Sequence, residues 1–149
     1  MNLKTVKPFS LIHKSGPGLY SIRQKSSGRF VDAHESGHDF SVVTRPAQHN
    51  DTQRWILTPV GGVYIIWQQS SGRFMDAHES GHDFSVVTRP PQHNDTQRWI
   101  IMSDGYGLNT IQQLSNLRFM DAHESGHDFS VVTRTVQNND TQRWLIDEL

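Results

Sequence analysis

Apolar and polar side chains alternate along short stretches of this 149-residue chain, and turn-forming residues separate the stretches. Alternation with a period of two is typical of β-strands that bury one face. In the first part of the chain the pattern predicts four strands, at about Leu19–Gln24, Arg29–His34, Ser41–Arg45 and Gln53–Thr58. Glycine, serine, aspartate and proline occupy the breaks between them, as expected for tight turns. No comparable stretch has the apolar spacing of an amphipathic helix.

The same pattern returns twice, almost letter for letter. The block from Arg29 to Trp55 recurs at Arg73 to Trp99 and at Arg118 to Trp144, with offsets of 44 and then 45 residues. Of its 27 positions, 23 are identical in all three copies. The copies differ at Val31, Pro46, Ala47 and His49 and at the equivalent positions. A unit this short cannot bury its own apolar face, so the three copies must share one core.

Three copies of four strands predict an all-β protein of twelve short strands without helices. Closing the sheet into a barrel would remove its exposed edges. Three equal sets indicate a β-trefoil, in which a six-stranded barrel is capped by three hairpins around a pseudo-threefold axis. A three-bladed propeller fits less well, because propellers usually have four or more blades. We expect one domain over residues 1–149, with repeats at about 18–61, 62–106 and 107–149. Phe9–Ile12, in the preceding segment 1–17, is a candidate extra strand.

Alternation also predicts which side chains face the core. In the second strand Val31 and Ala33 share one face, which we assign to the core, and Asp32 and His34 share the other, which we assign to a groove. The tryptophans and the apolar residues two positions later should also point inward. These residues are Trp55, Leu57, Trp99, Ile101, Trp144 and Ile146.

The third strand has two possible orientations. Either Val42 and Thr44 or Val43 and Arg45 share the buried face. The two residues of each pair are two positions apart, so alternation alone leaves the choice open.

Composition narrows the functional classes. Hydrophobic residues make up 34% of the chain and the mean hydropathy is -0.60, yet aromatic residues recur at fixed places. This balance indicates a globular domain with a polar surface. The formal net charge of -1 at pH 7 argues against binding to nucleic acids or directly to membrane surfaces. Nine histidines would move the charge towards +8 if all were protonated, so a pH-dependent partner is a hypothesis.

The chain has no cysteine, which excludes disulfides and thiol catalysis. Its first residues lack the apolar run of a signal peptide, and the longest apolar run, Val63–Trp67, is far too short to span a bilayer. We therefore expect a protein that is cytoplasmic or released without a signal peptide.

Each copy ends in Asp-Thr-Gln-Arg-Trp, a Gln-x-Trp triplet, and an aromatic-x-Asp motif precedes its glutamine by 21 residues. Three such pairs of motifs at this spacing resemble the ricin B-chain-like (R-type) β-trefoil lectin family, over about residues 18–149. The resemblance implies a non-catalytic glycan-binding protein without cofactors, with up to three equivalent shallow sugar pockets. Any contact with membranes would then be made through glycoconjugates.

The resemblance also implies roles for particular residues. In this family a pocket uses an aspartate at the end of the second strand, an aromatic platform on the third, and a polar residue before the Gln-x-Trp. Asp32 matches the aspartate and Gln53 the glutamine that supports it, and a carboxylate can accept hydrogen bonds from two sugar hydroxyls. This sequence has Arg45 where the family has the aromatic residue, and Thr52 where it usually has asparagine. A planar guanidinium favours an acidic glycan or phosphate over galactose-type stacking.

Some mollusc β-trefoil lectins similarly build their pockets from histidines and aspartates, which makes His34 and His49 candidate contacts. The predicted first site comprises Asp32, His34, Arg45, His49, Asn50, Asp51 and Gln53. The second comprises Asp76, His78, Arg89, His93, Asn94, Asp95 and Gln97, and the third Asp121, His123, Arg134, Asn138, Asn139, Asp140 and Gln142.

The identical polar letters have two interpretations. The strands that link the blocks have diverged far more than the polar turns within them, which favours binding as the reason for identity. The alternative is a turn and ion-pair network that every repeat requires. In that case Arg45 pairs with Asp32 or Glu35, Gly37 supplies a turn with positive φ, and Asp39 accepts hydrogen bonds within its turn.

Other functions are weaker matches. His34 and His38 with the nearby Asp32 suggest a metal site, but structural zinc sites usually need four ligands, so we expect none. Asp32 with Glu35 or Asp51 suggests a glycosidase pair, yet three shallow sites suit recognition better than catalysis. The second hypothesis is a histidine-rich, pH-responsive β-trefoil that binds actin or membranes, or a protease inhibitor.

Overall fold

The computed structural model describes residues 7–8 and 17–149. The strands are β1 (Lys7–Pro8), β2 (Gly18–Gln24), β3 (Phe30–Ala33), β4 (Val42–Arg45), β5 (Trp55–Val60), β6 (Val63–Gln68), β7 (Phe74–Ala77), β8 (Val86–Arg89), β9 (Trp99–Ser103), β10 (Asn109–Gln113), β11 (Phe119–Ala122), β12 (Val131–Arg134) and β13 (Trp144–Glu148). Six single turns of 3-10 helix separate them: η1 (His38–Phe40), η2 (Asp51–Gln53), η3 (His82–Phe84), η4 (Asp95–Gln97), η5 (His127–Phe129) and η6 (Asp140–Gln142). Within these residues no helix has the length and apolarity needed to cross a membrane.

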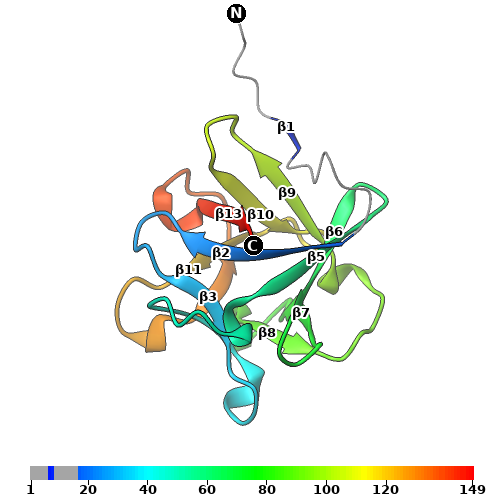
Figure 1. Ribbon diagram of the computed structural model, residues 1–149, viewed down its shortest axis with the longest axis vertical. Helices are drawn as coiled ribbons and strands as arrows, with labels where there is room; N and C mark the ends of the chain where they lie inside the picture. The colour runs from blue at the N-terminus through cyan, green and yellow to red at the C-terminus, as the bar shows by residue number, and fades with distance from the viewer. Residues whose placement is uncertain (1–6, 9–16) are drawn as a thin grey trace, which may run out of the picture.

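Six strands close into a barrel (Figure 1). The ring runs β2, β5, β6, β9, β10, β13 and back to β2, with every neighbouring pair antiparallel. The pairing of β13 with β2 joins the two ends of the repeated region, from Trp144 opposite Gln24 to Glu148 opposite Tyr20. Closure satisfies the edges that three open repeats would leave unpaired.

Three hairpins, β3–β4, β7–β8 and β11–β12, form a cap on this barrel. Single bridges connect them in a ring: Ser41 with Val87, Ser85 with Val132, and Val43 with Ser130. The arrangement is the predicted β-trefoil, and the twelve predicted strands correspond to β2–β13. The candidate strand at Phe9–Ile12 lies outside the described residues, whereas β1 pairs with β9 just before it. The 3-10 turns were not predicted.

The core settles the orientation of the third strand in each repeat. Val42 and Thr44 are 0% and 1% exposed and lie opposite Ala33 and Val31, so these four side chains share the inward face. Val43 lies opposite Asp32 on the other face and is buried against the neighbouring hairpin instead.

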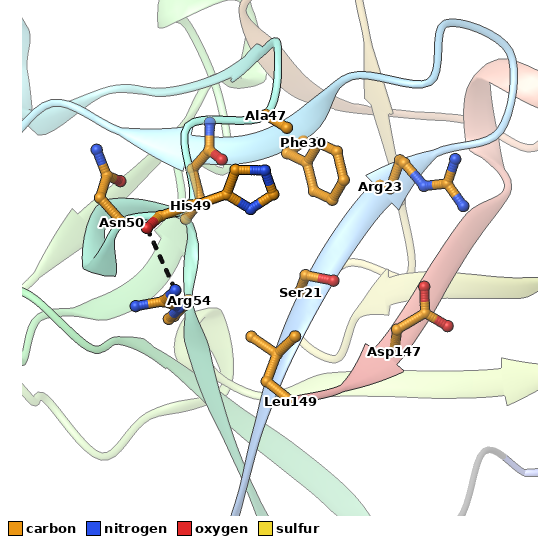
Figure 2. Close-up of a pocket in the computed structure, with 10 residues that line it drawn as sticks. Ser21, Arg23, Phe30, Ala47, His49, Asn50, Arg54, Asp147 and Leu149 are labelled. Carbon is orange, nitrogen blue, oxygen red and sulfur yellow. Dashed lines mark hydrogen bonds between the residues drawn. The ribbon is translucent and has the colours of Figure 1, made fainter.

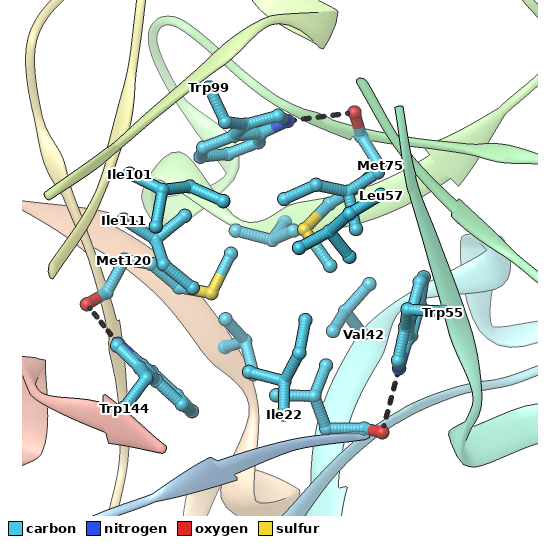
Figure 3. Packing of buried hydrophobic residues seen from close by; sticks show 14 of the residues in the cluster. Ile22, Val42, Trp55, Leu57, Met75, Trp99, Ile101, Ile111, Met120 and Trp144 are labelled. Carbon is cyan, nitrogen blue, oxygen red and sulfur yellow. Dashed lines mark hydrogen bonds between the residues drawn. The ribbon is translucent and has the colours of Figure 1, made fainter. Parts of the chain in front are cut away.

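The three tryptophans pack in the shared core as predicted (Figure 3). Trp55, Trp99 and Trp144 are each 0% exposed. The indole Nε1 of Trp55 donates to the carbonyl of Val31 at 3.1 Å, and the other two make the equivalent bond to Met75 and Met120. Each tryptophan thereby ties the last strand of its repeat to the second one, while its polar group remains satisfied.

Buried glutamines join consecutive repeats. Gln68, at the end of β6, is 0% exposed, and its Nε2 donates to the carbonyls of Ala33 at 3.3 Å and Thr52 at 2.9 Å in the preceding repeat. Gln113 does the same to the second repeat, and Gln24 to the third. The barrel therefore closes through side chains as well as through strand pairing.

We predict that Gln68→Met lowers the free energy of unfolding by about 1–3 kcal/mol, because methionine fills the space but leaves the carbonyls of Ala33 and Thr52 without a donor. Urea unfolding followed by tryptophan fluorescence measures the change. Gln69→Met is the control, since this neighbouring side chain is exposed, and it should change stability by less than about 0.5 kcal/mol. Equal effects from the two variants would contradict the assigned role of Gln68.

Candidate functional site

The structure divides the predicted site residues of each repeat into two groups. Asp32, His34 and Arg45 meet on the outer face of hairpin β3–β4. We call this group, and the equivalent groups of the other two repeats, the cap clusters. His49, Asn50 and Gln53 line a separate pocket beside β2, which we call the outer pocket. Asp51 belongs to neither group, because its Oδ1 pairs with Nη1 of Arg54 at 2.8 Å on the surface. Asp95 and Asp140 pair in the same way with Arg98 and Arg143.

Asp32 is buried rather than facing a groove, so this part of the sequence prediction is wrong. Its side chain is 0% exposed, its Oδ1 accepts from the backbone N–H of Ala33 at 2.8 Å, and its Oδ2 accepts from Gln53 Nε2 at 3.0 Å. The Nη1 of Arg45 lies 3.5 Å from Oδ1. The predicted support by glutamine and the pairing with arginine are thus confirmed. Asp76 and Asp121 have the same contacts with Gln97 and Arg89 and with Gln142 and Arg134.

The burial has a simple cause. Val43, opposite Asp32 in the hairpin, packs against the hairpin of the third repeat, and the guanidinium of Arg45 lies over the carboxylate. A carboxylate taken out of water needs hydrogen bonds and a counter-charge, and here it has both. Asp32 therefore holds Arg45 in place and is not itself open to a ligand in this conformation.

His34 lies between the buried aspartate and the surface. The Nη2 of Arg45 is 3.3 and 3.4 Å from its two ring nitrogens, and the ring of His38 stacks on it with centroids 4.3 Å apart. Burial lowers the pKa of His34, and the positive charges of Arg45 and of protonated His38 lower it further. Among the described residues no group of three or more histidine, aspartate or glutamate side chains is placed to hold a metal ion. His78 and His123 have the same surroundings and a lowered pKa.

Each cap cluster is completed by a residue from another repeat. The Oδ2 of Asp39 lies 3.7 Å from Nε2 of His78 in the next repeat, although the sequence indicated a role within its own turn. Asp83 approaches His123 at 3.7 Å, and Asp128 approaches His34 at 3.8 Å. These carboxylates are more than three-quarters exposed, so solvent screens them and they do not reverse the lowered histidine pKa.

The turn that carries Asp39 is left-handed. Gly37, His38, Asp39 and Phe40 have φ of 58°, 44°, 54° and 55°, which confirms the positive φ predicted at the glycine. For His38, Asp39 and Phe40 this backbone conformation is less favourable than the right-handed one by roughly 1–2 kcal/mol per residue. Contacts with the neighbouring repeat must therefore hold the turn in place.

An arginine and a phenylalanine provide such a contact, and neither was predicted from the sequence. Cζ of Arg73 lies 3.6 Å from the ring centroid of Phe40, and its Nε donates to Oγ1 of Thr88 at 3.1 Å. The equivalent pairs are Arg118 with Phe84 and Arg29 with Phe129. Their identity in all copies was the available signal, but spacing along one repeat does not reveal a partner in the next.

The outer pocket of the first repeat has a volume of about 300 Å³ (Figure 2). Of the predicted residues in its wall, Gln53 and Asn50 are already engaged: Gln53 Oε1 accepts from the backbone N–H of Gln48, and Asn50 Oδ1 caps η2 by accepting from Thr52. The ring of His49 makes none of the described hydrogen bonds and borders the pocket.

Comparison with known proteins agrees with the motifs and the fold. Residues 8–88, more than half of the chain, match the family described as ricin-type beta-trefoil lectin domain-like. The chain belongs to this family. No curated protein matches this ricin-type trefoil by sequence.

Three solved structures share the fold of this ricin-type trefoil. The designed threefold symmetric protein ThreeFoil has a TM-score of 0.81 at 24% identity, over 89% of this chain and 99% of that one. The exo-β-1,3-galactanase of Clostridium thermocellum has a TM-score of 0.79 at 21% identity, over 89% of this chain and 30% of the enzyme. The Polyporus squamosus lectin, bound to Neu5Acα2-6Galβ1-4GlcNAc, has a TM-score of 0.76 at 23% identity, over 91% of this chain and 50% of the lectin. The trefoil thus spans only part of the latter two chains.

We predict that the protein loses stability as the pH falls from 7.5 to 5.5. An unfolded histidine titrates near 6.5, and the pKa of His34, His78 and His123 is lower in the folded state, so protons bind the unfolded chain first. Their stabilising contribution is complete above the unfolded pKa and is lost below it. Each can reduce the free energy of unfolding by at most about 1.4 kcal/mol per pH unit.

Urea unfolding at pH 7.5, 6.5 and 5.5 tests this dependence. Substituting the three cap histidines by glutamine should flatten the profile. The double variant His49→Gln/His93→Gln, which removes two exposed imidazoles outside the cap, should keep most of the wild-type slope. A steep profile in the cap variant would show that other groups carry the pH dependence.

Proposed function

We propose that this protein is a non-catalytic carbohydrate-binding module with up to three equivalent sugar sites at the cap clusters. The observation that carries the proposal is the same set of partly exposed polar groups at three places around the cap, on a chain of the ricin-type lectin family. The trefoils of a galactanase and of a lectin bound to a sialylated glycan support this ligand class.

The sugar contacts differ from those expected from the family motif. Because Asp32 is covered, the groups available at the first cluster are the guanidinium of Arg45, 31% exposed, the exposed ring of His38 and the carboxylate of Asp128. The buried carboxylate of Asp32 holds the guanidinium of Arg45 in position. Each site then contains groups from two repeats, and none exists in an isolated repeat.

Acidic sugars fit these clusters better than neutral ones. The phenylalanine beside each cluster is already stacked with an arginine at 3.6–3.7 Å, so a face of its ring is taken up and less of it is open to galactose-type stacking. A guanidinium can bind a carboxylate through two parallel hydrogen bonds, and the side chain of Arg45 is 31% exposed. We therefore propose sugars that carry a carboxylate as the preferred ligands of the cap.

The same geometry favours recognition over hydrolysis. A glycosidase needs two carboxyl groups that flank one bond, at set separations. Asp32 is buried and fully engaged, whereas Glu35 is exposed on the turn, so the two do not face a common substrate. Three equivalent sites also increase avidity, because a second engagement is intramolecular.

We predict that the double variant Arg89→Ala/Arg134→Ala binds a surface array of sialylated and uronate-containing glycans at least tenfold more weakly than the wild type. Two of the three sites are then lost, and with them the avidity. The matched control is Arg98→Ala/Arg143→Ala, which removes the same charge from the same two repeats, outside the cap clusters. The control should bind as the wild type does.

Thermal unfolding of both double variants confirms that they fold. A wild-type protein that binds no glycan on the array contradicts the proposed function. Equal binding by the two double variants contradicts the assignment to the cap clusters.

A further inference from the structure

The outer pocket of the first repeat contains polar groups that the protein itself does not use. Ser21 and Arg23 of β2 and Asp147 of β13 line it, together with the rings of Phe30 and His49 (Figure 2). None of the first three side chains makes a hydrogen bond or ion pair with any described residue. Ser21 is only 9% exposed, so its hydroxyl has little access to bulk water except through the pocket.

Strand pairing places these groups side by side. Asp147 lies directly opposite Ser21 where β13 pairs with β2, and Arg23 is two residues further along the same face. Cζ of Arg23 lies 5.7 Å from the ring centroid of Phe30, too far for close stacking. The hydroxyl of Ser21, the guanidinium of Arg23 and the carboxylate of Asp147 therefore lie on the same side of the pocket, beside the ring of Phe30.

The pocket does not follow the threefold symmetry of the cap. At the position of Arg23 the second repeat has Trp67, which stacks on Phe74 with ring centroids 6.5 Å apart, and the third repeat has Gln112. Ala47 and His49, which line the pocket, are two of the four block positions that vary between copies. Asp147 belongs to the third repeat and adds a group from a different barrel strand, β13.

We propose that this pocket binds a single neutral hexopyranose ring, at a site distinct from the three cap clusters. The face of Phe30 attracts the C–H groups on one side of the ring, because the face of an aromatic ring carries partial negative charge. The carboxylate of Asp147 accepts from sugar hydroxyls, and Arg23 and Ser21 donate to sugar oxygens. The proposal rests on the proposed function only for the class of ligand.

Charge and size both select this ligand. The opposite charges of Arg23 and Asp147 balance, so the pocket offers no net attraction to an anion, and Arg54 is already paired with Asp51. A volume of about 300 Å³ is at the small end of the range for ligand pockets, which suits one sugar ring rather than a chain of them.

Titration of the ¹⁵N-labelled full chain with methyl β-D-galactopyranoside and methyl β-D-glucopyranoside, followed by NMR, tests the proposal. We expect saturable shifts of the backbone amides of Ser21, Arg23, Phe30 and His49 with at least one glycoside. The equivalent amides of the second and third repeats should not shift.

The decisive variant is Arg23→Trp, which gives the first repeat the residue that the second already accommodates as Trp67. The indole should fill the pocket and weaken binding at least tenfold. Gln112→Trp, the same change at the equivalent position of the third repeat, is the matched control and should bind normally. Asp147→Asn, an isosteric change at an exposed position, should also weaken binding without affecting the fold.

The outcomes separate this site from the cap. Saturable shifts confined to the cap clusters, or unchanged binding by both Arg23→Trp and Asp147→Asn, overturn the pocket and leave the proposed function standing. The absence of any saturable shift at the pocket with either glycoside also overturns it. The glycan array with the cap variants remains an independent test, because those variants leave the first repeat unchanged.

Discussion

The whole structure depends on the contact that each repeat makes with the one before it. A buried glutamine bridges two carbonyls of the preceding repeat, as Gln68 does to the first, and an arginine of the same repeat, Arg73, stacks on the preceding Phe40. This head-to-tail contact closes after three copies, as a heterologous interface does in a ring of subunits. A single repeat has neither its core nor its polar partners, so the trefoil forms as a unit.

Closure of this ring explains much of the identity of the 27-residue block. Asp39 faces His78 and Asp83 faces His123, so each letter of the block must fit another copy of the block as well as its own. A substitution in one copy of the block must therefore fit an unchanged residue in another copy. The structural and binding interpretations of the polar letters are therefore not exclusive: Asp32 and Gln53 are committed to the fold, whereas part of Arg45 remains at the surface.

The sequence was sufficient for the elements and insufficient for the contacts between repeats. Alternation and the repeat period located the strands of the barrel and the buried tryptophans, because both depend on local periodicity. The choice between Val42 and Val43 was not local, since packing of one hairpin on another decided it. The burial of Asp32 escaped prediction for the same reason. A motif gives the type of a side chain and its spacing, but not the group that covers it.

Symmetry constrains some positions and releases others. The cap residues contact another repeat and stay identical, while the outward positions of the barrel, such as Arg23 and Trp67, contact no copy of themselves and have diverged. Divergence costs little there, because neither the tryptophan core nor the glutamine bridges extend to that surface. A symmetric fold can thus acquire one asymmetric site without weakening its closure. In this protein, variation between the copies is consequently as informative about function as their identity.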